Sequence, residues 1–377
     1  MKPSSRTWTE IDLAALRHNL TFARQYSGHQ VMAILKANAY GHGIRPLAKY
    51  LDAQGLPYFG IANCHEAQLL TEAGCRTPLF LLGATTPEER EIVVQKGWTP
   101  CLSSLTEIEQ FTSLCHQHQK TLRAHLAFDT GMGRGGFLPS QLTEALNLLS
   151  QPAQAGIELV GIGSHLPSAD EDPEFTREQF QAFDKLVNQG IELRQGRPFP
   201  HVHLANSAGL LDYTSCTTNL VRPGLLLYGI SPLPHWQSHL IPVMTLRSRV
   251  SLVRTLPVGQ GISYGRSAIL KKETRVATIG IGYGDGYPRS ISQAAEASVI
   301  IHNQRAPLLG RITMDQIMVD VSEIPEVTPG DEVELFGKQL PLSEVSAWAG
   351  TIPWEILTRI TPRVERHYLN QEEFPES

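Results

Sequence analysis

Residues 31–43 read Val-Met-Ala-Ile-Leu-Lys-Ala-Asn-Ala-Tyr-Gly-His-Gly, five apolar residues followed directly by a lysine. A short apolar run of this length, bounded by glycine and polar residues, is typical of a buried strand. Lys36 then stands at the carboxyl end of that strand, where barrel enzymes place their catalytic groups. The stretch therefore predicts a strand of a parallel sheet with a candidate catalytic lysine at its end.

Similar apolar runs recur as far as about residue 235, and helix-period segments lie between them. One helix is expected to begin after the N-cap residue Asp12, and another carries Phe180 and Phe183 on one face and ends at Gly190. Strand–helix alternation over about 225 residues fits a (β/α)8 barrel in length, and a doubly wound sheet fits the same alternation. The predicted strands are residues 31–35, 58–62, 78–82, 122–128, 158–164, 201–205 and 219–228.

The pattern changes after about Pro242, where apolar and polar residues alternate with a period of two, as in half-buried strands. Turn sequences such as Pro-Gly-Asp at 329–331 separate these segments, so this half predicts an all-β domain. The alternating segments are residues 245–254, 275–281, 316–321 and 331–336.

The predicted fold class is therefore α/β, a (β/α)8 TIM-type barrel followed by a C-terminal all-β domain. We expect the barrel to cover residues 10–238 and the β-domain residues 239–377. The N-terminal residues 1–9, which include Trp8, could pair with either domain.

Bulk composition limits the class of protein. The chain has 377 residues, which is too long for one ordinary core and fits two domains. Its net charge of -5 gives no basic field that would attract nucleic acid or an anionic membrane. The first six residues lead into an acidic helix start instead of a signal peptide, and no apolar run reaches membrane-spanning length. We therefore expect a protein without nucleic-acid or membrane partners.

The cysteines indicate a reducing compartment. They are odd in number and have no C-x-x-C spacing, which argues against a disulfide framework or a zinc site. We accordingly expect a cytoplasmic protein with no metal site. The five cysteines are residues 64, 75, 101, 115 and 216.

The position of Lys36 suits a nucleophilic amine. Partial burial at a strand end would lower the pKa of the amine and leave more of it neutral to attack an aldehyde. Taken alone, the same lysine could simply leave the strand for solvent. The surrounding sequence decides between the two interpretations.

Eight short motifs resemble, in order, those of the alanine racemases. Residues 36–43 closely resemble the cofactor-lysine motif of that family, and residues 128–134, Phe-Asp-Thr-Gly-Met-Gly-Arg, its substrate-arginine loop. Each match is weak by itself, but eight in family order across both halves of the chain are specific. The other matches are residues 164–171, 205–208, 221–229, 263–265, 282–286 and 310–316.

The resemblance implies a racemase that interconverts L-alanine and D-alanine with pyridoxal 5'-phosphate, supplying D-alanine for peptidoglycan. Lys36 would hold the cofactor as a Schiff base and act as the base for the D-enantiomer, and Tyr264 would serve the L-enantiomer. Two bases on opposite faces allow a proton to leave one face and return to the other. A tyrosine is a poor base unless a positive environment favours its phenolate, and the linked His165 and Arg222 would provide that environment.

The resemblance also implies how the cofactor and substrate are held. Arg222 would bond the pyridine nitrogen and keep it unprotonated, because a guanidinium does not readily give up its proton. Arg134 and the backbone at Met314 would hold the substrate carboxylate. Tyr264 and Met314 would enter the partner's active site, so a homodimer with shared sites is expected. The expected phosphate ligands and their neighbour are Tyr40, Ser207, Gly224, Leu225 and Asn206.

Three positions depart from the family pattern. Ala127 stands where many members carry a carbamylated lysine that braces the arginine, so that brace is missing for Arg134. We expect a bound anion, ordered water or another polar group to replace it, and a weaker possibility is that Arg134 turns to solvent until substrate arrives. Thr313 replaces a common cysteine. Pro362 replaces a tyrosine that binds phosphate in some members, so no phosphate ligand is assigned there.

Other interpretations of the motifs are weaker. Residues 131–136 match the G-x-G-x-x-G pattern of nicotinamide-binding folds, but Arg134 and Pro139 crowd the turn and no acid ends the next strand. His201 and His203 share one face of a strand, as some metal pairs do. No nearby acid or cysteine completes such a site, which favours structural histidines.

Three rival functions remain. A non-catalytic pyridoxal-phosphate-binding protein would lack the second domain, and a decarboxylase of similar fold would generally carry a cysteine donor and a longer β-domain. The third alternative to an alanine racemase is a racemase of another small amino acid such as serine, which would carry the same motifs.

Overall fold

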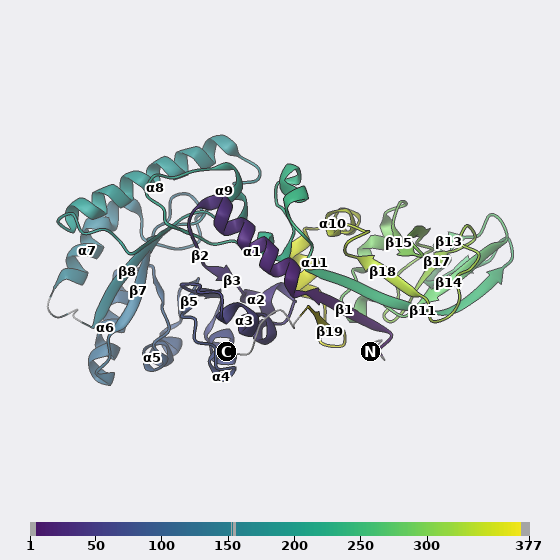
Figure 1. Ribbon diagram of the computed structural model, residues 1–377, viewed down its shortest axis with the longest axis horizontal. Coiled ribbons are helices and arrows are strands. Elements are labelled where there is room, and N and C mark those ends of the chain that lie inside the picture. Colours follow the sequence, from purple (N-terminus) through teal and green to yellow (C-terminus); the bar gives the residue numbers. More distant parts are fainter. Residues whose placement is uncertain (1–4, 152, 154–155, 371–377) are drawn as a thin grey trace.

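The computed structural model describes residues 5–151, 153 and 156–370, which form two parts joined side by side (Figure 1). The first part is a ring of short strands surrounded by helices, and the second is built around a twisted sheet. The long strand β11 (Met244–Leu256) runs from the junction far into the second part. No helix in the described ranges is both long and apolar enough to cross a membrane.

The first part is a closed parallel barrel. Its strands pair as β3–β4–β5, as β6–β7–β8–β9 and as β10–β2, every pair parallel. A bridge from Phe80 to Thr99 joins β5 to β6, and the amide of Arg222 donates to the carbonyl of Ala205 to join β9 to β10. Because β2 and β3 are two halves of one strand broken at Met32, the described chain has eight barrel strands. They are β2 (Gln30–Val31), β3 (Ala33–Ile34), β4 (Phe59–Ile61), β5 (Leu79–Leu81), β6 (Cys101–Leu102), β7 (Leu122–Ala127), β8 (Ile157–Gly163), β9 (His201–His203) and β10 (Leu220–Val221).

The strands and helices alternate as the sequence predicts. Asp12 is the N-cap of the first helix, and its carboxylate accepts the amide of Ala15 at 3.2 Å. Only β6 has no counterpart among the predicted strands, because its two residues stand between Pro100 and two serines and are not part of a longer apolar run. The helices of this part are α1 (Leu13–Ser27), α2 (Lys36–Tyr40), α3 (Ile44–Asp52), α4 (Cys64–Glu72), α5 (Pro87–Lys96), α6 (Leu105–His118), α7 (Leu142–Ser150), α8 (Pro173–Leu193) and α9 (Ser207–Asp212).

Two predicted boundaries are wrong. Helix α8 continues past Gly190, which is a packing position: a Cβ there would lie 2.9 Å from the Phe199 ring. The strand predicted over residues 219–228 ends at Val221, and a 3-10 helix, Leu225–Tyr228, follows. The cause is Ser207, whose hydroxyl oxygen accepts the amides of Gly224 and Leu226 and takes them out of the strand ladder.

The second part is mostly β. Strand β1 pairs antiparallel with β11 and parallel with β19, so the N-terminal segment joins this sheet. Two short helices, α10 (Leu342–Ala349) and α11 (Pro353–Arg359), add to the all-β pattern that the sequence predicts. Residues 1–4 and 371–377 of the expected domain bounds lie outside the described residues. The remaining strands are β1 (Thr7–Asp12), β12 (Gly261–Ile262), β13 (Ala268–Ile269), β14 (Thr274–Ile279), β15 (Ser298–Ile301), β16 (Gln304–Pro307), β17 (Ile317–Asp320), β18 (Glu332–Phe336) and β19 (Glu365–Leu369).

One continuous hydrophobic core extends through both parts. Asn19 of α1 is fully buried beside the segment that connects them. Its amide nitrogen donates to the carbonyls of Leu227 and Ile241, and its oxygen accepts the amide of Ile241 at 3.0 Å. A single polar side chain therefore fixes the connecting segment against the barrel.

Replacing Asn19 with leucine should destabilise the protein strongly. Leucine has a similar branched shape but leaves the buried carbonyl of Leu227 and the part-buried carbonyl and amide of Ile241 without their partner, which should lower the free energy of unfolding by roughly 2–4 kcal/mol. The midpoint of thermal unfolding measures the loss. Gln25→Leu, on an exposed position of the same helix, is the control and should leave the midpoint nearly unchanged. Equal midpoints for the two variants would contradict the role of Asn19.

Three buried histidines make stability depend on pH. His42, His125 and His203 are almost inaccessible to solvent. Burial lowers the pKa of His42 from 6.5 to about 4, and burial with neighbouring positive groups holds the pKa of His125 and His203 well below 6.5. Below pH 6.5 the unfolded chain takes up protons that the folded chain does not.

Stability should therefore fall as the pH is lowered from about 6.5 to about 4, by up to ~1.4 kcal/mol per pH unit for each histidine. The thermal midpoint of cofactor-free protein, measured at about pH 7.5 and about pH 5.5, should drop at the lower value. His42→Phe should have a lower midpoint at both values but a smaller difference between them. A wild-type midpoint that is flat over this range would refute the prediction.

Candidate active site

A cavity of about 740 Å³ opens at the carboxyl ends of the barrel strands. Residues of the second part also line it, among them Trp354, Glu355 and Thr358 around α11. The cavity therefore collects residues from both halves of the chain. Of the residues predicted from the sequence, it brings together Lys36, Tyr40, Arg134, His165, Asn206, Ser207, Arg222, Gly224 and Leu225.

Lys36 lies in this cavity at the start of α2, directly after β3. Burial and the positive charge of Arg134 lower the pKa of its amine, against the opposing influence of the Glu66 carboxylate. Glu66 is itself buried and accepts the amides of Ala37 and Ala62 at 2.6 and 2.9 Å. It thereby ties the turn after Lys36 to the end of β4. A larger neutral fraction makes this amine a better nucleophile.

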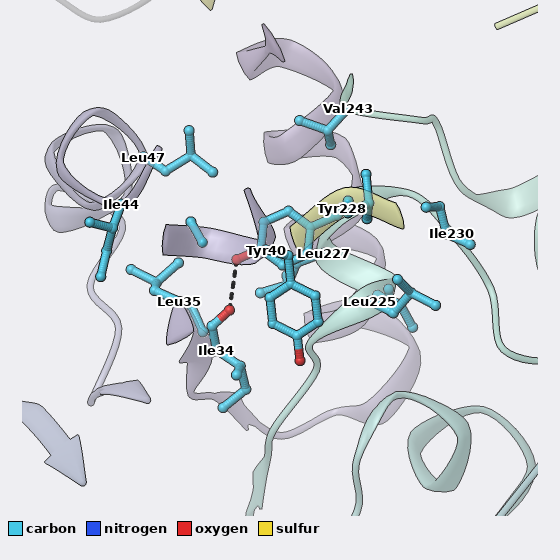
Figure 2. Packing of buried hydrophobic residues seen from close by; sticks show 14 of the residues in the cluster. Ile34, Leu35, Tyr40, Ile44, Leu47, Leu225, Leu227, Tyr228, Ile230 and Val243 are labelled. Atoms are coloured by element: carbon cyan, nitrogen blue, oxygen red, sulfur yellow. Dashed lines mark hydrogen bonds between the residues drawn. The ribbon is translucent and has the colours of Figure 1, made fainter. Parts of the chain in front are cut away.

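Tyr40 also lines the cavity. Its ring stacks on that of Tyr228 with 4.8 Å between centroids, and Tyr228 donates its hydroxyl to the carbonyl of Ile34 at 2.7 Å (Figure 2). A Cβ at Gly224 would lie 2.4 Å from the Tyr40 oxygen, so glycine is needed for this approach. Burial raises the pKa of Tyr40 to about 12. The hydroxyl therefore remains a hydrogen-bond donor at neutral pH.

Ser207 and Asn206 lie beside Tyr40 but differ in what they can offer. The Ser207 oxygen accepts two amides, from Gly224 and Leu226, which leaves its hydroxyl proton available for another acceptor. Asn206 caps α9 by accepting the amide of Gly209, and its nitrogen donates to the carbonyl of Leu166. Ser207 is thus suited to bind an anion, whereas Asn206 shapes the wall.

Arg222 is a buried cation that no carboxylate pairs with in the described part of the chain. It donates to the carbonyl of Ser164 at 2.7 Å and to Nδ1 of both His203 and His165. Burial lowers its pKa only to about 10, so it remains charged at neutral pH. The guanidinium keeps its proton and faces the cavity.

The charge of Arg222 determines the protonation of His165. A guanidinium has no acceptor, so Nδ1 of His165 must accept the bond and the ring proton must sit on Nε2. Burial lowers the pKa of His165 to about 3, with Arg222 and Arg134 contributing. His165 is therefore a neutral ring that presents an Nε2 donor.

Two further histidines support Arg222. Nδ1 of His203 accepts from the guanidinium, and its Nε2 then donates to Nδ1 of His125 at 2.8 Å. His125 in turn lies 3.4 Å from the Tyr58 hydroxyl. His203 is thus a structural histidine, as the sequence favours, but with a contact that sequence analysis missed. Its position on the inner face of a barrel strand was the available signal.

Arg134 lies exposed on the loop after β7, and the described residues offer it no ion pair or side-chain hydrogen bond. Asp129 shapes this loop by accepting the amides of Gly131, Met132 and Gly133. Among the described residues, no side chain replaces the modified lysine that is missing at Ala127, and the exposed Arg134 agrees with the alternative in which it faces solvent. A bound anion or water at Arg134 stays a prediction.

Tyr264 and Met314 stand apart from the cavity. Both belong to the second part, and they are 70% and 52% exposed. Neither lines the cavity of its own chain.

Comparison with known proteins identifies the family. Models of the alanine racemase N-terminal and C-terminal domains match residues 11–232 and 243–368. An alanine racemase of Desulforamulus reducens is 37% identical, over 96% of this chain and 98% of its own length, and one of Synechocystis sp. is 38% identical over 96% and 98%.

Solved structures agree with this assignment. The alanine racemase of Clostridium difficile 630 superposes with a TM-score of 0.89 at 31% identity, covering 98% of this chain and 97% of that one. The alanine racemase of Bartonella henselae with covalently bound pyridoxal phosphate has a TM-score of 0.87 at 30% identity, covering 97% and 100%. Sequence and fold over nearly the whole length together place this chain in the alanine racemase family of isomerases.

Proposed function

We propose that this protein interconverts L-alanine and D-alanine with pyridoxal 5'-phosphate bound through Lys36. The observation that carries the proposal is the composition of the cavity: an amine with a lowered pKa, a buried cation without a carboxylate and a set of hydroxyl donors. The product D-alanine would serve peptidoglycan synthesis. The free cysteines, Cys64, Cys75, Cys101, Cys115 and Cys216, support a reducing compartment such as the cytoplasm.

The residues present fit the cofactor. The hydroxyls of Tyr40 and Ser207, with the backbone amide of Leu225, offer donors suited to a phosphate, and the Gly224 amide holds the Ser207 oxygen in place beside them. Arg222 offers a permanent N–H donor suited to a pyridine nitrogen, which it would keep unprotonated. Bound pyridoxal phosphate supplies the electron sink that stabilises the carbanion left when the α-proton departs.

The protein's own residues would then move the proton. Neutral Lys36 takes or returns it on one face of the substrate, and the partner subunit's Tyr264 does so on the other. The Nε2 donor of His165 and the charge of Arg222 favour the phenolate that such a base requires. Arg134, exposed at the cavity, would bind the substrate carboxylate together with the backbone at Met314 of the partner subunit.

The placement of Tyr264 supports a homodimer with shared sites. Its side chain is 70% exposed and lies outside the cavity of its own chain, as does Met314. The family resemblance assigns both side chains to the active site of a second subunit, and their exposure leaves them available for it. We therefore infer that each active site is completed by a second copy of the chain.

Substrate choice is tested directly with a panel of L-amino acids, scored for the D-enantiomer by chiral chromatography. Alanine should be the best substrate. Faster formation of D-serine than of D-alanine would make serine the substrate. If no amino acid gave a D-product, the protein would be a pyridoxal-phosphate-binding protein without racemase activity.

Replacing Lys36 with alanine should abolish both covalent cofactor binding and racemisation. The wild-type protein should be yellow, and borohydride reduction followed by peptide mapping should place the pyridoxyl group on Lys36. The variant should be colourless after dialysis because no other amine lies in the cavity among the described residues. A pyridoxyl group found on another lysine would end the proposal.

Replacing Tyr264 with phenylalanine should keep the cofactor but block one face. Exchange of the α-proton from L-alanine should fall far more than exchange from D-alanine, and racemisation should fail in both directions because each direction needs both bases. Proton exchange followed by NMR in deuterated water measures both rates. Equal losses for the two enantiomers would contradict the assignment of faces.

Mixing the inactive Lys36→Ala and Tyr264→Phe chains tests the shared site. In a heterodimer, one of the two sites combines an intact Lys36 with an intact Tyr264, so some activity should return. Absence of rescue, when heterodimers have been demonstrated by mass spectrometry, would refute shared sites while leaving the chemistry at Lys36 intact.

A further inference from the structure

The segment labelled α2, which begins at Lys36, is not a regular α-helix but a turn with an unusual backbone. Four successive non-glycine residues, Ala37 to Tyr40, have φ between 51° and 55°, in the left-handed region. L-residues disfavour this region because the Cβ approaches the following carbonyl oxygen, and runs of it are rare. Such a segment persists only when its surroundings hold it.

Part of that support is local. The amide of Gly43 donates to the carbonyl of Asn38, and the Asn38 side chain accepts the amide of Ile44 at 2.8 Å. Glu66 accepts the amide of Ala37. These contacts pair backbone amides in and directly after the turn. The carbonyls of Gly41 and His42, which follow the turn, accept hydrogen bonds from another part of the chain.

The other support comes from the last strand of the chain. The Tyr368 hydroxyl donates to the carbonyl of His42 at 3.0 Å, and Nε of Arg366 donates to the carbonyl of Gly41 at 3.1 Å. Both side chains belong to β19, more than 320 residues along the chain from the turn. The two hydrogen bonds therefore connect the C-terminal sheet directly to the segment that carries Lys36.

The glycines of the turn allow this close approach. A Cβ at Gly43 would lie 2.0 Å from the Tyr368 hydroxyl, and one at Gly41 would lie 2.1 Å from the carbonyl oxygen of Leu357 in α11. Both glycines also have positive φ, at 98° and 80°. The Gly-His-Gly sequence is thus shaped to receive side chains and backbone from the second part.

The strand that supplies these donors is itself firmly placed. Tyr368 is paired with Ile11 in the parallel ladder between β19 and β1. The guanidinium of Arg366 also donates to the carbonyls of Ile360, Thr361 and Val364, which fixes its direction. The donors can therefore impose a position on the turn instead of following it.

We propose that Tyr368 and Arg366 are positioning residues for Lys36: from the C-terminal strand they hold the left-handed turn in the conformation in which Lys36 and Tyr40 face the cofactor site. The inference rests on the proposed function. It adds that the second part of the chain, besides supplying an interface, maintains the cofactor site of its own subunit.

Tyr368→Phe is the discriminating variant, because it removes one hydroxyl and keeps the ring. Tyr26→Phe is the matched control: Tyr26 likewise donates to a backbone carbonyl, that of Leu211 at 2.6 Å, which belongs to α9 and not to the turn. Three quantities are compared with the wild type. They are the Kd for pyridoxal phosphate by absorbance titration, amide hydrogen exchange at Gly41, His42 and Gly43 in cofactor-free protein, and the thermal midpoint.

Tyr368→Phe should raise the Kd for pyridoxal phosphate about tenfold, which corresponds to ~1.4 kcal/mol, and should speed exchange at the three amides. Both variants should lower the thermal midpoint by a similar amount, because each loses one hydrogen bond. Tyr26→Phe should leave the Kd and the exchange rates of the three amides unchanged. A Tyr368→Phe protein with wild-type Kd and wild-type exchange would overturn the inference. So would a variant that fails to fold when Tyr26→Phe folds, because the hydroxyl would then support the whole fold and not the turn.

The two proposals fail in different ways. A wild-type protein that binds no pyridoxal phosphate ends the proposed function, whereas equal binding by wild type and Tyr368→Phe ends only this inference. Arg366→Lys provides an independent variant, since lysine keeps the charge but cannot reach four carbonyls at once. It should also raise the Kd and speed exchange at Gly41.

Discussion

The active site depends on one buried positive charge. Arg222 is buried, and no carboxylate among the described residues pairs with it. A buried cation of this kind needs neutral hydrogen-bond acceptors in place of water. It finds them in the carbonyl of Ser164 and in Nδ1 of His165 and His203. These bonds set the tautomer of each ring, and the positive charge helps to keep both rings unprotonated. The same charge adds to burial and to Arg134 in lowering the pKa of the Lys36 amine.

Much of the fold could be predicted from the sequence. Short apolar runs indicate buried parallel strands, and segments that alternate with a period of two indicate half-buried strands. Both the barrel and the sheet of the second part were therefore recognisable from the sequence. The errors lie where tertiary contacts override local pattern. Gly190 suggests a helix end in the sequence, but it makes room for the Phe199 ring inside the helix. After Val221, the amide of Gly224 donates to the Ser207 hydroxyl oxygen instead of to a neighbouring strand. The domain bounds of 10–238 and 239–377, with 1–9 joined to the second, stay a prediction, although β1 does pair in the C-terminal sheet.

The site was predictable only where motifs mark it. Lys36, Arg222 and their neighbours belong to recognisable stretches, and the cavity gathers them. His203, Glu66 and the residues around α11 could not be assigned roles from the sequence, because each acts through a contact with residues far along the chain. The replacement expected for the missing brace at Arg134 stays a prediction. A bound anion or water leaves no pattern in the sequence, and the exposure of a loop side chain, which the structure shows for Arg134, does not follow from residue spacing.

The pairing of β1 between β11 and β19 also orders events during synthesis. The first strand to leave the ribosome has its final neighbours only after residue 369 has been made, since β19 is the last strand described. Until β19 is made, β1 therefore has at least one unpaired backbone edge, of the kind that pairs with other chains. The barrel strands that precede residue 222 can close earlier, but the hydrogen bonds from Tyr368 and Arg366 to the lysine turn cannot. A nascent chain thus acquires its cofactor pocket last, at the moment when its two ends meet.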